Sequence, residues 1–108
     1  MDALKVLAQL AAAATTTETL YTVPAATVTT TSTLVVCNRG STTLTFRVSV
    51  HVAGAGADNK TFIFYDAPLN GNSTLSFTIG MTLGPADLVK TYASASGLSF
   101  NLFGVETS

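Results

Sequence analysis

Residues 44–52 read LTFRVSVHV, and this stretch decides the fold class of the chain. Every second residue is apolar, and the residues between them are polar. An alternation with a period of two predicts a β-strand that buries one face and exposes the other. We therefore expect Phe46 and Val48 to point into a core, with Arg47 and His51 on the outer face. The same period recurs in residues 74–79 and 98–102, which indicates an all-β protein.

Further strands and turns surround these segments. Two stretches are apolar at consecutive positions, residues 34–37 and 62–65, which is typical of strands covered on both faces. Residues 20–23, 27–33 and 88–93 are weaker strand candidates. Turns are predicted at Pro24 and in the ranges 54–59, 68–72 and 84–85, with Asn70-Gly71 as a hairpin tip. Seven or eight short strands predict a single antiparallel β-sandwich or jelly-roll-like domain over residues 15–108.

Residues 1–14 form a predicted N-terminal arm whose conformation the sequence leaves open. A helical stripe and a strand alternation fit equally well: the first would use Leu4, Leu7, Ala11 and Ala14, and the second Leu4, Val6, Ala8 and Leu10. In either form the arm could dock on a neighbouring molecule. Asp2 and Gln9 argue against a cleaved signal peptide. No apolar run approaches the ~20 residues of a membrane-spanning helix, so we expect no membrane partner.

The surface chemistry is polar but almost uncharged. Of 108 residues only 10% are charged, the net charge is −1, and 19 Thr and 9 Ser supply much of the polarity. Five cations are scattered singly along the chain, at Lys5, Arg39, Arg47, Lys60 and Lys90. Nucleic-acid binding requires clustered cations, so we expect no nucleic-acid partner. Short uncharged side chains pack against another protein without desolvating charges, which favours a protein that works in an assembly.

The sequence indicates no catalytic, cofactor-binding or metal-binding residues, and we expect no enzyme. Cys37 is the only cysteine and lies in an apolar segment, so a Cys37–His51 dyad is disfavoured and His51 is expected at the surface. Asp58, Asp66 and Asp87 are predicted to form turns. The glycine-rich stretch 54–56 precedes a strand, whereas a phosphate-binding loop precedes a helix. Residues 59–61 and 72–74 match the N-glycosylation pattern by sequence only.

Several short segments resemble small virion proteins of tailed bacteriophages. The resemblance is carried by residues 20–25, 34–40 and 45–48, and continues through residues 60–66, 78–80, 92–94 and 98–101. It covers most of the chain from about residue 18 onward, and these motifs are structural, not catalytic. Residues 10–12 depart from it, because relatives carry a turn there. The resemblance implies an all-β sandwich that sits on the phage head as a cement or decoration protein, or in the neck or tail.

We therefore predict a non-enzymatic bacteriophage structural protein, assembled in the host cytoplasm and located in the virion. In the main hypothesis it is a capsid cement or decoration protein, a homotrimer that binds the major capsid protein between capsomers and stabilises the head. The alternative is a neck, tail or baseplate-associated sandwich that recognises host-surface carbohydrate. For the alternative, Tyr65-Asp66 beside the Asn70-Gly71 turn is the best available patch.

Overall fold

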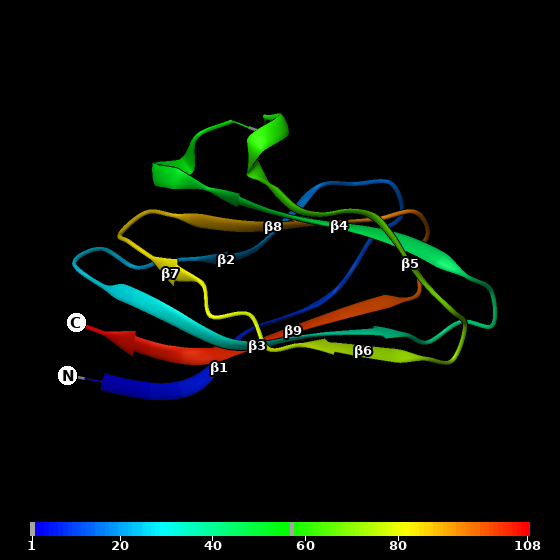
Figure 1. The fold of residues 1–108 in the computed structure, drawn as a ribbon, viewed down its shortest axis with the longest axis horizontal. Coiled ribbons are helices and arrows are strands. Elements are labelled where there is room, and N and C mark those ends of the chain that lie inside the picture. Colours follow the sequence, from blue (N-terminus) through cyan, green and yellow to red (C-terminus); the bar gives the residue numbers. More distant parts are fainter. Residues whose placement is uncertain (1, 57) are drawn as a thin grey trace.

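The computed structural model describes residues 2–56 and 58–108, and these residues form an antiparallel β-sandwich of two sheets (Figure 1). Met1, in the predicted arm, and Ala57, in the predicted turn over residues 54–59, lie outside the described residues. The predicted fold class is confirmed. The described residues contain nine strands where the sequence predicted seven or eight, because β1 and the two-residue β7 are strands of their own.

The first sheet, sheet A, contains β1 (Asp2–Ala11), β9 (Leu98–Thr107), β3 (Val28–Asn38) and β6 (Thr74–Phe77), in that order. A short strand, β7 (Thr82–Leu83), also pairs with β3. The second sheet, sheet B, has the order β2 (Glu18–Thr22), β8 (Leu88–Ala93), β4 (Leu44–His51) and β5 (Phe62–Leu69). Two single 3₁₀ turns, η1 (Val52–Gly54) and η2 (Asn59–Thr61), lie in the loop between β4 and β5.

Residues 2–11 of the predicted N-terminal arm, for which the sequence fits a helix and a strand equally well, form a strand. β1 runs antiparallel to β9 from Asp2, opposite Thr107, to Ala11, opposite Ser99. Consequently the two ends of the described chain lie at the same end of sheet A (Figure 1). Leu7 and Leu10 of β1 pack against the core, and Ala12 just after it is buried. Residues 2–11 are thus the edge strand of a sheet, joined to it along their whole length.

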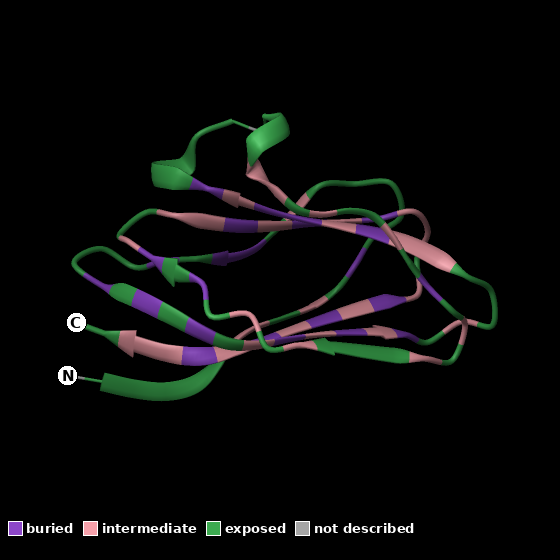
Figure 2. Ribbon diagram, in the orientation of Figure 1, coloured by how far each residue is buried: buried purple, intermediate pink, exposed green. Residues whose placement is uncertain are grey.

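The core lies between the sheets and follows the predicted alternation. Figure 2 shows buried and less buried residues alternating along the central strands. Phe46, Val48, Leu98, Phe100 and Leu102 are fully buried, as expected from the period of two. Phe46 lies at the centre of an aromatic cluster, with ring centroids 5.6 Å from Phe64, 6.3 Å from Phe77 and 6.1 Å from Phe100. Aromatic pairs at these separations add to the stability gained from burial.

Two strand predictions are wrong in detail. Residues 62–65 were expected to be covered on both faces, but β5 is an edge strand and Ile63 and Tyr65 are exposed. Val52 was expected to continue the buried face of β4, but β4 ends at His51 and Val52 is 70% exposed in η1. The first error arises because β5 lies at the edge of sheet B, and the second because the chain leaves the sheet after His51.

The predicted hairpin tip at Asn70-Gly71 is also wrong. This turn joins β5 of sheet B to β6 of sheet A, so it crosses between sheets and connects no paired strands. The position needs glycine because of a close approach: a Cβ on Gly71 would lie 2.3 Å from the carbonyl carbon of Ser41. The left-handed residue of the turn is Asn72, with φ 56°. The glycine of the Asn70-Gly71 pair therefore reflects a tight backbone contact and not a hairpin tip.

Candidate functional site

The outer face of sheet B carries a cluster of side chains that an irregular strand brings together. Along β4, Phe46 pairs with Ala67 and Val48 pairs with Phe64, so only Arg47 lies between these pairs. On β5, two residues occupy the same interval, Tyr65 and Asp66. This arrangement is a β-bulge, and it lets neighbouring residues reach one side of a sheet. Asp66 has φ 51°, a left-handed conformation that non-glycine residues adopt at a cost.

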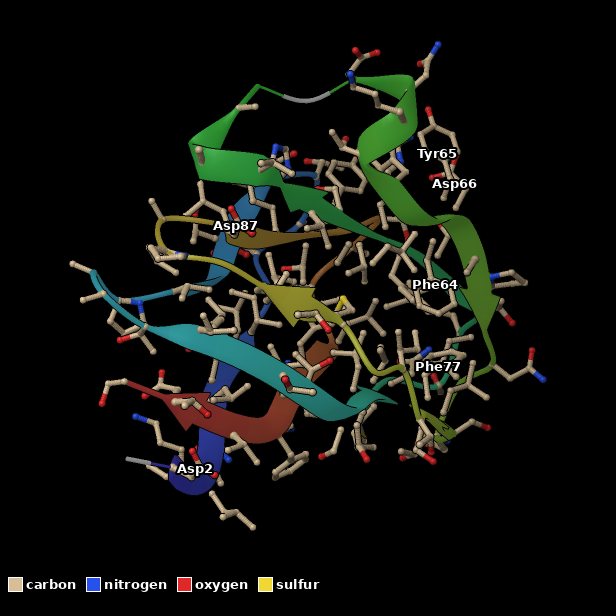
Figure 3. All side chains as sticks on the ribbon, turned by 60° about the vertical axis from the view of Figure 1, so that its left-hand side comes forward. Asp2, Phe64, Tyr65, Asp66, Phe77 and Asp87 are labelled. Carbon is tan, nitrogen blue, oxygen red and sulfur yellow. The ribbon has the colours of Figure 1, made fainter. Side chains whose placement is uncertain are left out.

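A second bulge follows directly. Val48 pairs with Phe64 and the next residue, Ser49, pairs with Phe62, which leaves Ile63 as the extra residue. Phe62 therefore shares the outer face with Ser49, while Phe64 stays on the core side. The rings of Phe62 and Tyr65 meet edge to face at a centroid distance of 4.9 Å. Figure 3 shows Tyr65 and Asp66 close together beside η2, and Phe64 and Phe77 lower down, toward the core.

The guanidinium of Arg47 is held between two tyrosine rings. Its central carbon lies 4.3 Å from the ring centroid of Tyr65 and 4.5 Å from that of Tyr92, both within the range of cation–π contacts. Arg47 Nε donates to Asp66 Oδ1 at 2.7 Å and Nη2 donates to Oδ2 at 3.3 Å. The hydrogen bond to Asp66 raises the pKa of Arg47 above its usual value. We call Arg47, Phe62, Tyr65, Asp66 and Tyr92 the Arg47 site.

A hollow of about 550 Å³ opens at this site, lined by Arg47, Asn59, Phe62 and Tyr65. Asn59 is positioned by η2, whose capping residue Asp58 accepts a hydrogen bond from the Asn59 backbone N–H at 2.6 Å. The turn prediction for Asp58 is therefore confirmed. Tyr65 is 59% exposed, so much of its surface is open to a ligand.

The predicted carbohydrate patch is partly redrawn by this geometry. Tyr65 and Asp66 lie together as expected, but Asp66 forms no turn: it sits in a strand bulge and pairs with Arg47. The Asn70-Gly71 turn lies beyond the end of β5 and does not line the hollow, where Asn59 supplies the amide. Sequence reasoning also missed the roles of Arg47 and Tyr92. The alternation along β4 places Arg47 on the outer face, but its position opposite Tyr92 follows only from the sheet order.

His51 is buried, which corrects the prediction that it lies at the surface. It is only 1% exposed although it is on the outer face of β4, because the loop between β4 and β5 folds over it. Its Nδ1 donates to the carbonyl oxygen of Ala55 at 2.7 Å, which leaves Nε2 to accept from the Ser49 hydroxyl at 2.8 Å. His51 thus fixes the glycine-rich loop to the sheet.

The remaining candidates do not form a reactive group. Cys37 and His51 point to the outer faces of opposite sheets, so the sandwich separates the two members of the conceivable dyad. Asp87 has the predicted turn role, since its carboxylate accepts from the backbone N–H groups of Ala53 and Gly84 at 2.8 Å. In residues 2–56 and 58–108, no three His, Cys, Asp or Glu side chains are grouped as a metal site requires. Asn59 and Asn72, which begin the two glycosylation triplets, are both exposed.

A polar network closes one end of the sandwich. The Tyr21 hydroxyl bonds to Thr29 at 2.8 Å and donates to Glu106, which also pairs with Lys5 at 2.9 Å. Burial and the hydrogen bond to Glu106 raise the pKa of Tyr21 to about 12. The contacts from Lys5 and then from Tyr21 lower the pKa of Glu106. The network ties β1 and β9 of sheet A to β2 of sheet B.

The outer face of sheet A has a different character. In the register of the sheet, five apolar residues point outward at one end: Leu4, Val6, Val28, Phe103 and Val105. Leu4 is 81% exposed, and Val6 and Val28 are 47% and 46% exposed. We call these five residues the apolar band. Contiguous exposed apolar surface on a small protein marks a contact with another molecule more often than scattered single residues do.

Comparisons with known proteins give no family. No protein-family model matches the chain, and no curated protein is significantly similar to it. The resemblance to phage virion proteins therefore stays a prediction. The described part of the chain contains no helix with the length and hydrophobicity that crossing a bilayer demands.

Proposed function

We propose that this chain is a non-enzymatic structural protein of a tailed-bacteriophage virion, and that it assembles through the apolar band and the edge of β1. The observation that supports the proposal is the exposure of Leu4 and Val6 on an edge strand. When a partner covers exposed apolar side chains, their removal from water stabilises the complex by about 25 cal/mol per Å² of buried apolar surface. A stable, permanent contact is the simplest use of such a surface.

The edge of β1 adds directional contacts to this apolar surface. β1 ends sheet A, so one side of its backbone is open to hydrogen bonding by a further strand. Natural edge strands are often guarded by free charges. The two charges of β1 are instead engaged within the chain: Asp2 accepts from Thr107 at 2.9 Å, and Lys5 pairs with Glu106. These charges therefore do little to prevent a strand of another molecule from pairing with β1.

The occupant that we assign to this surface is a second copy of the chain. A net charge of −1 provides little repulsion between copies, and closed symmetry keeps their association from growing into fibres. In a homotrimer, the Arg47 site on the opposite sheet would stay open. Such a trimer would bind the major capsid protein between capsomers, where many weak contacts made at once add up to firm attachment.

Light scattering on the purified protein tests the assembly step. We expect a particle of about three times the 11.1 kDa chain mass, and a monomer for the double variant Leu4→Asp/Val6→Asp. Both residues are exposed, so circular dichroism of the double variant should match that of the wild type. Val52 is an apolar residue of intermediate exposure, 70%, between those of Leu4 and Val6, and it lies above sheet B; the Val52→Asp variant is the control and should remain trimeric. A wild-type monomer at high concentration would overturn the assembly proposal.

Quantitative mass spectrometry of purified virions tests the location. Hundreds of copies per particle support a cement protein. A few copies favour the alternative, a neck, tail or baseplate-associated sandwich, and absence from virions contradicts both forms of the proposal. The alternative is supported by the outer face of sheet B, where the Arg47 site combines one exposed and two half-buried aromatic rings with polar groups.

A further inference from the structure

We propose that the Arg47 site binds a neutral saccharide, whose ring lies against Phe62 and Tyr65 and whose hydroxyl groups bond to Asn59 and to the Arg47–Asp66 pair. This inference deepens the carbohydrate-binding alternative and does not depend on the apolar band. It assigns a ligand class to a hollow whose residues play no part in the sandwich core.

The first support is that the site is built by distortion of the strand. In a regular strand, Tyr65 and Asp66 would point to opposite faces. The bulge opposite Arg47 and the left-handed φ of Asp66 turn both toward the same group. Backbone strain of this kind costs free energy and is concentrated at functional sites. The second bulge adds Phe62 to the same face.

The shape and lining suit a small hydroxylated ring. A hollow of about 550 Å³ falls within the range of roughly 300–1,000 Å³ usual for small-molecule sites. Tyrosine and phenylalanine are rigid and amphipathic or apolar, so they offer contact area at little entropic cost. The C–H face of a sugar ring is apolar while its rim is polar, which matches aromatic rings bordered by an amide and an ion pair.

The polar groups have hydrogen-bonding capacity to spare. A guanidinium has five N–H donors, and two nitrogens of Arg47 are used on Asp66. The Asp66 carboxylate retains free lone pairs, and it is an acceptor for hydroxyl groups. The side-chain amide of Asn59 makes no hydrogen bond within the described residues, so both its donor and acceptor are available.

Electrostatics favour a neutral ligand over a charged one. Asp66 neutralises Arg47 through two hydrogen bonds, so an acidic sugar or a phosphate would have to displace an ion pair that is already formed. Single-stranded nucleic acid also stacks on aromatic rings, but it follows a positively charged groove. The lining of this hollow holds one cation, Arg47, and that cation is paired.

NMR titration of the ¹⁵N-labelled protein tests the proposal. The probes are methyl glycosides of glucose, galactose, N-acetylglucosamine and rhamnose, together with a ten-residue thymidine oligonucleotide. We expect at least one glycoside to shift the amide resonances of β5 and η2. Tyr65→Ser should weaken its affinity about tenfold or more, because the exposed ring is removed without disturbing the core. Val52→Ser, on the same side of the molecule, is the control and should bind as the wild type does.

Two outcomes would overturn this inference: no glycoside shifts these resonances, whether or not the oligonucleotide does, or a glycoside binds Tyr65→Ser as tightly as the wild type. Failure here is distinguishable from failure of the assembly proposal. The trimer depends on Leu4 and Val6 and is read by light scattering, whereas glycoside binding depends on Tyr65 and is read residue by residue.

Discussion

Gly104 is a position where one added methyl group should have a large effect. It lies on β9 where this strand passes between β1 and β3. In a Gly104→Ala variant, the new Cβ would lie 2.4 Å from the carbonyl oxygen of Thr30 and 2.8 Å from Cα of Thr31. Both obstacles are backbone atoms of β3, so no side-chain rotation can relieve the clash.

The cost follows from these distances. Non-bonded heavy atoms pack at about 3.5 Å, so β9 and β3 must separate by about 1 Å at this point. Overpacking of a core costs about 1–3 kcal/mol, and a clash with backbone atoms held by hydrogen bonds belongs at the upper end. We therefore expect the free energy of unfolding to fall by about 3 kcal/mol. For a chain of this length, that corresponds to a melting temperature about 12–24 °C lower.

Thermal unfolding followed by circular dichroism measures this effect. Gly80→Ala is the matched control, because a Cβ at Gly80 has no neighbour within 4 Å among the described residues. The control should stay within about 0.5 kcal/mol of the wild type. A Gly104→Ala protein that melts within about 3 °C of the wild type would refute the close approach of β9 to β3.

Three further predictions concern polar groups that are buried or half-buried. Tyr21 has a folded pKa of about 12 against about 10 in the unfolded chain, so unfolding releases a proton between these values and stability falls as the pH rises from 10 to 12. Denaturant titrations at pH 9 and 11.5 should show this fall in the wild type and not in Tyr21→Phe; equal falls would contradict it. The lowered pKa of Glu106 stabilises the fold above the unfolded pKa of about 4.3, and this contribution is lost as the pH drops through the folded pKa. Urea unfolding from pH 7 to 2.5 should show a shallower acid loss in Glu106→Gln, and identical profiles would argue against the network. His51→Ala removes both hydrogen bonds to the loop and should cost about 2–4 kcal/mol. Limited proteolysis should cut residues 52–61 faster in this variant, and unchanged cleavage would argue that His51 does not fix the loop.

The inward-facing residues could be predicted from sequence because a strand has only two faces. Once Phe46 and Val48 are assigned to the core, the period of two fixes the rest of β4. The same logic placed Phe100 and Leu102 correctly. It failed for His51, because the residues that cover His51 come from a loop that no local pattern describes. Burial on the outer face of a sheet depends on tertiary packing, and alternation reports only the inner face.

The Arg47 site was harder to predict for a related reason. Its geometry depends on a one-residue mismatch between β4 and β5, and a mismatch exists only after two strands have been paired. Position 66 is an aspartate and not a glycine, so the sequence of β5 does not indicate a left-handed residue there. Tyr65 and Asp66 could be named as exposed polar positions. Their partners Arg47 and Tyr92 come from two other strands and follow from the sheet order.

The position of β9 also sets the order in which the chain can be completed during synthesis. β1 and β3 leave the ribosome early, yet each needs β9 as its neighbour in sheet A, and β9 lies at the opposite end of the sequence. Contacts between distant segments form slowly, and unpaired edges are prone to aggregation while they wait. Sheet B, by contrast, has all four strands once residue 93 has emerged. A nascent chain should therefore hold an ordered sheet B beside an unfinished sheet A until residues 98–107 have emerged.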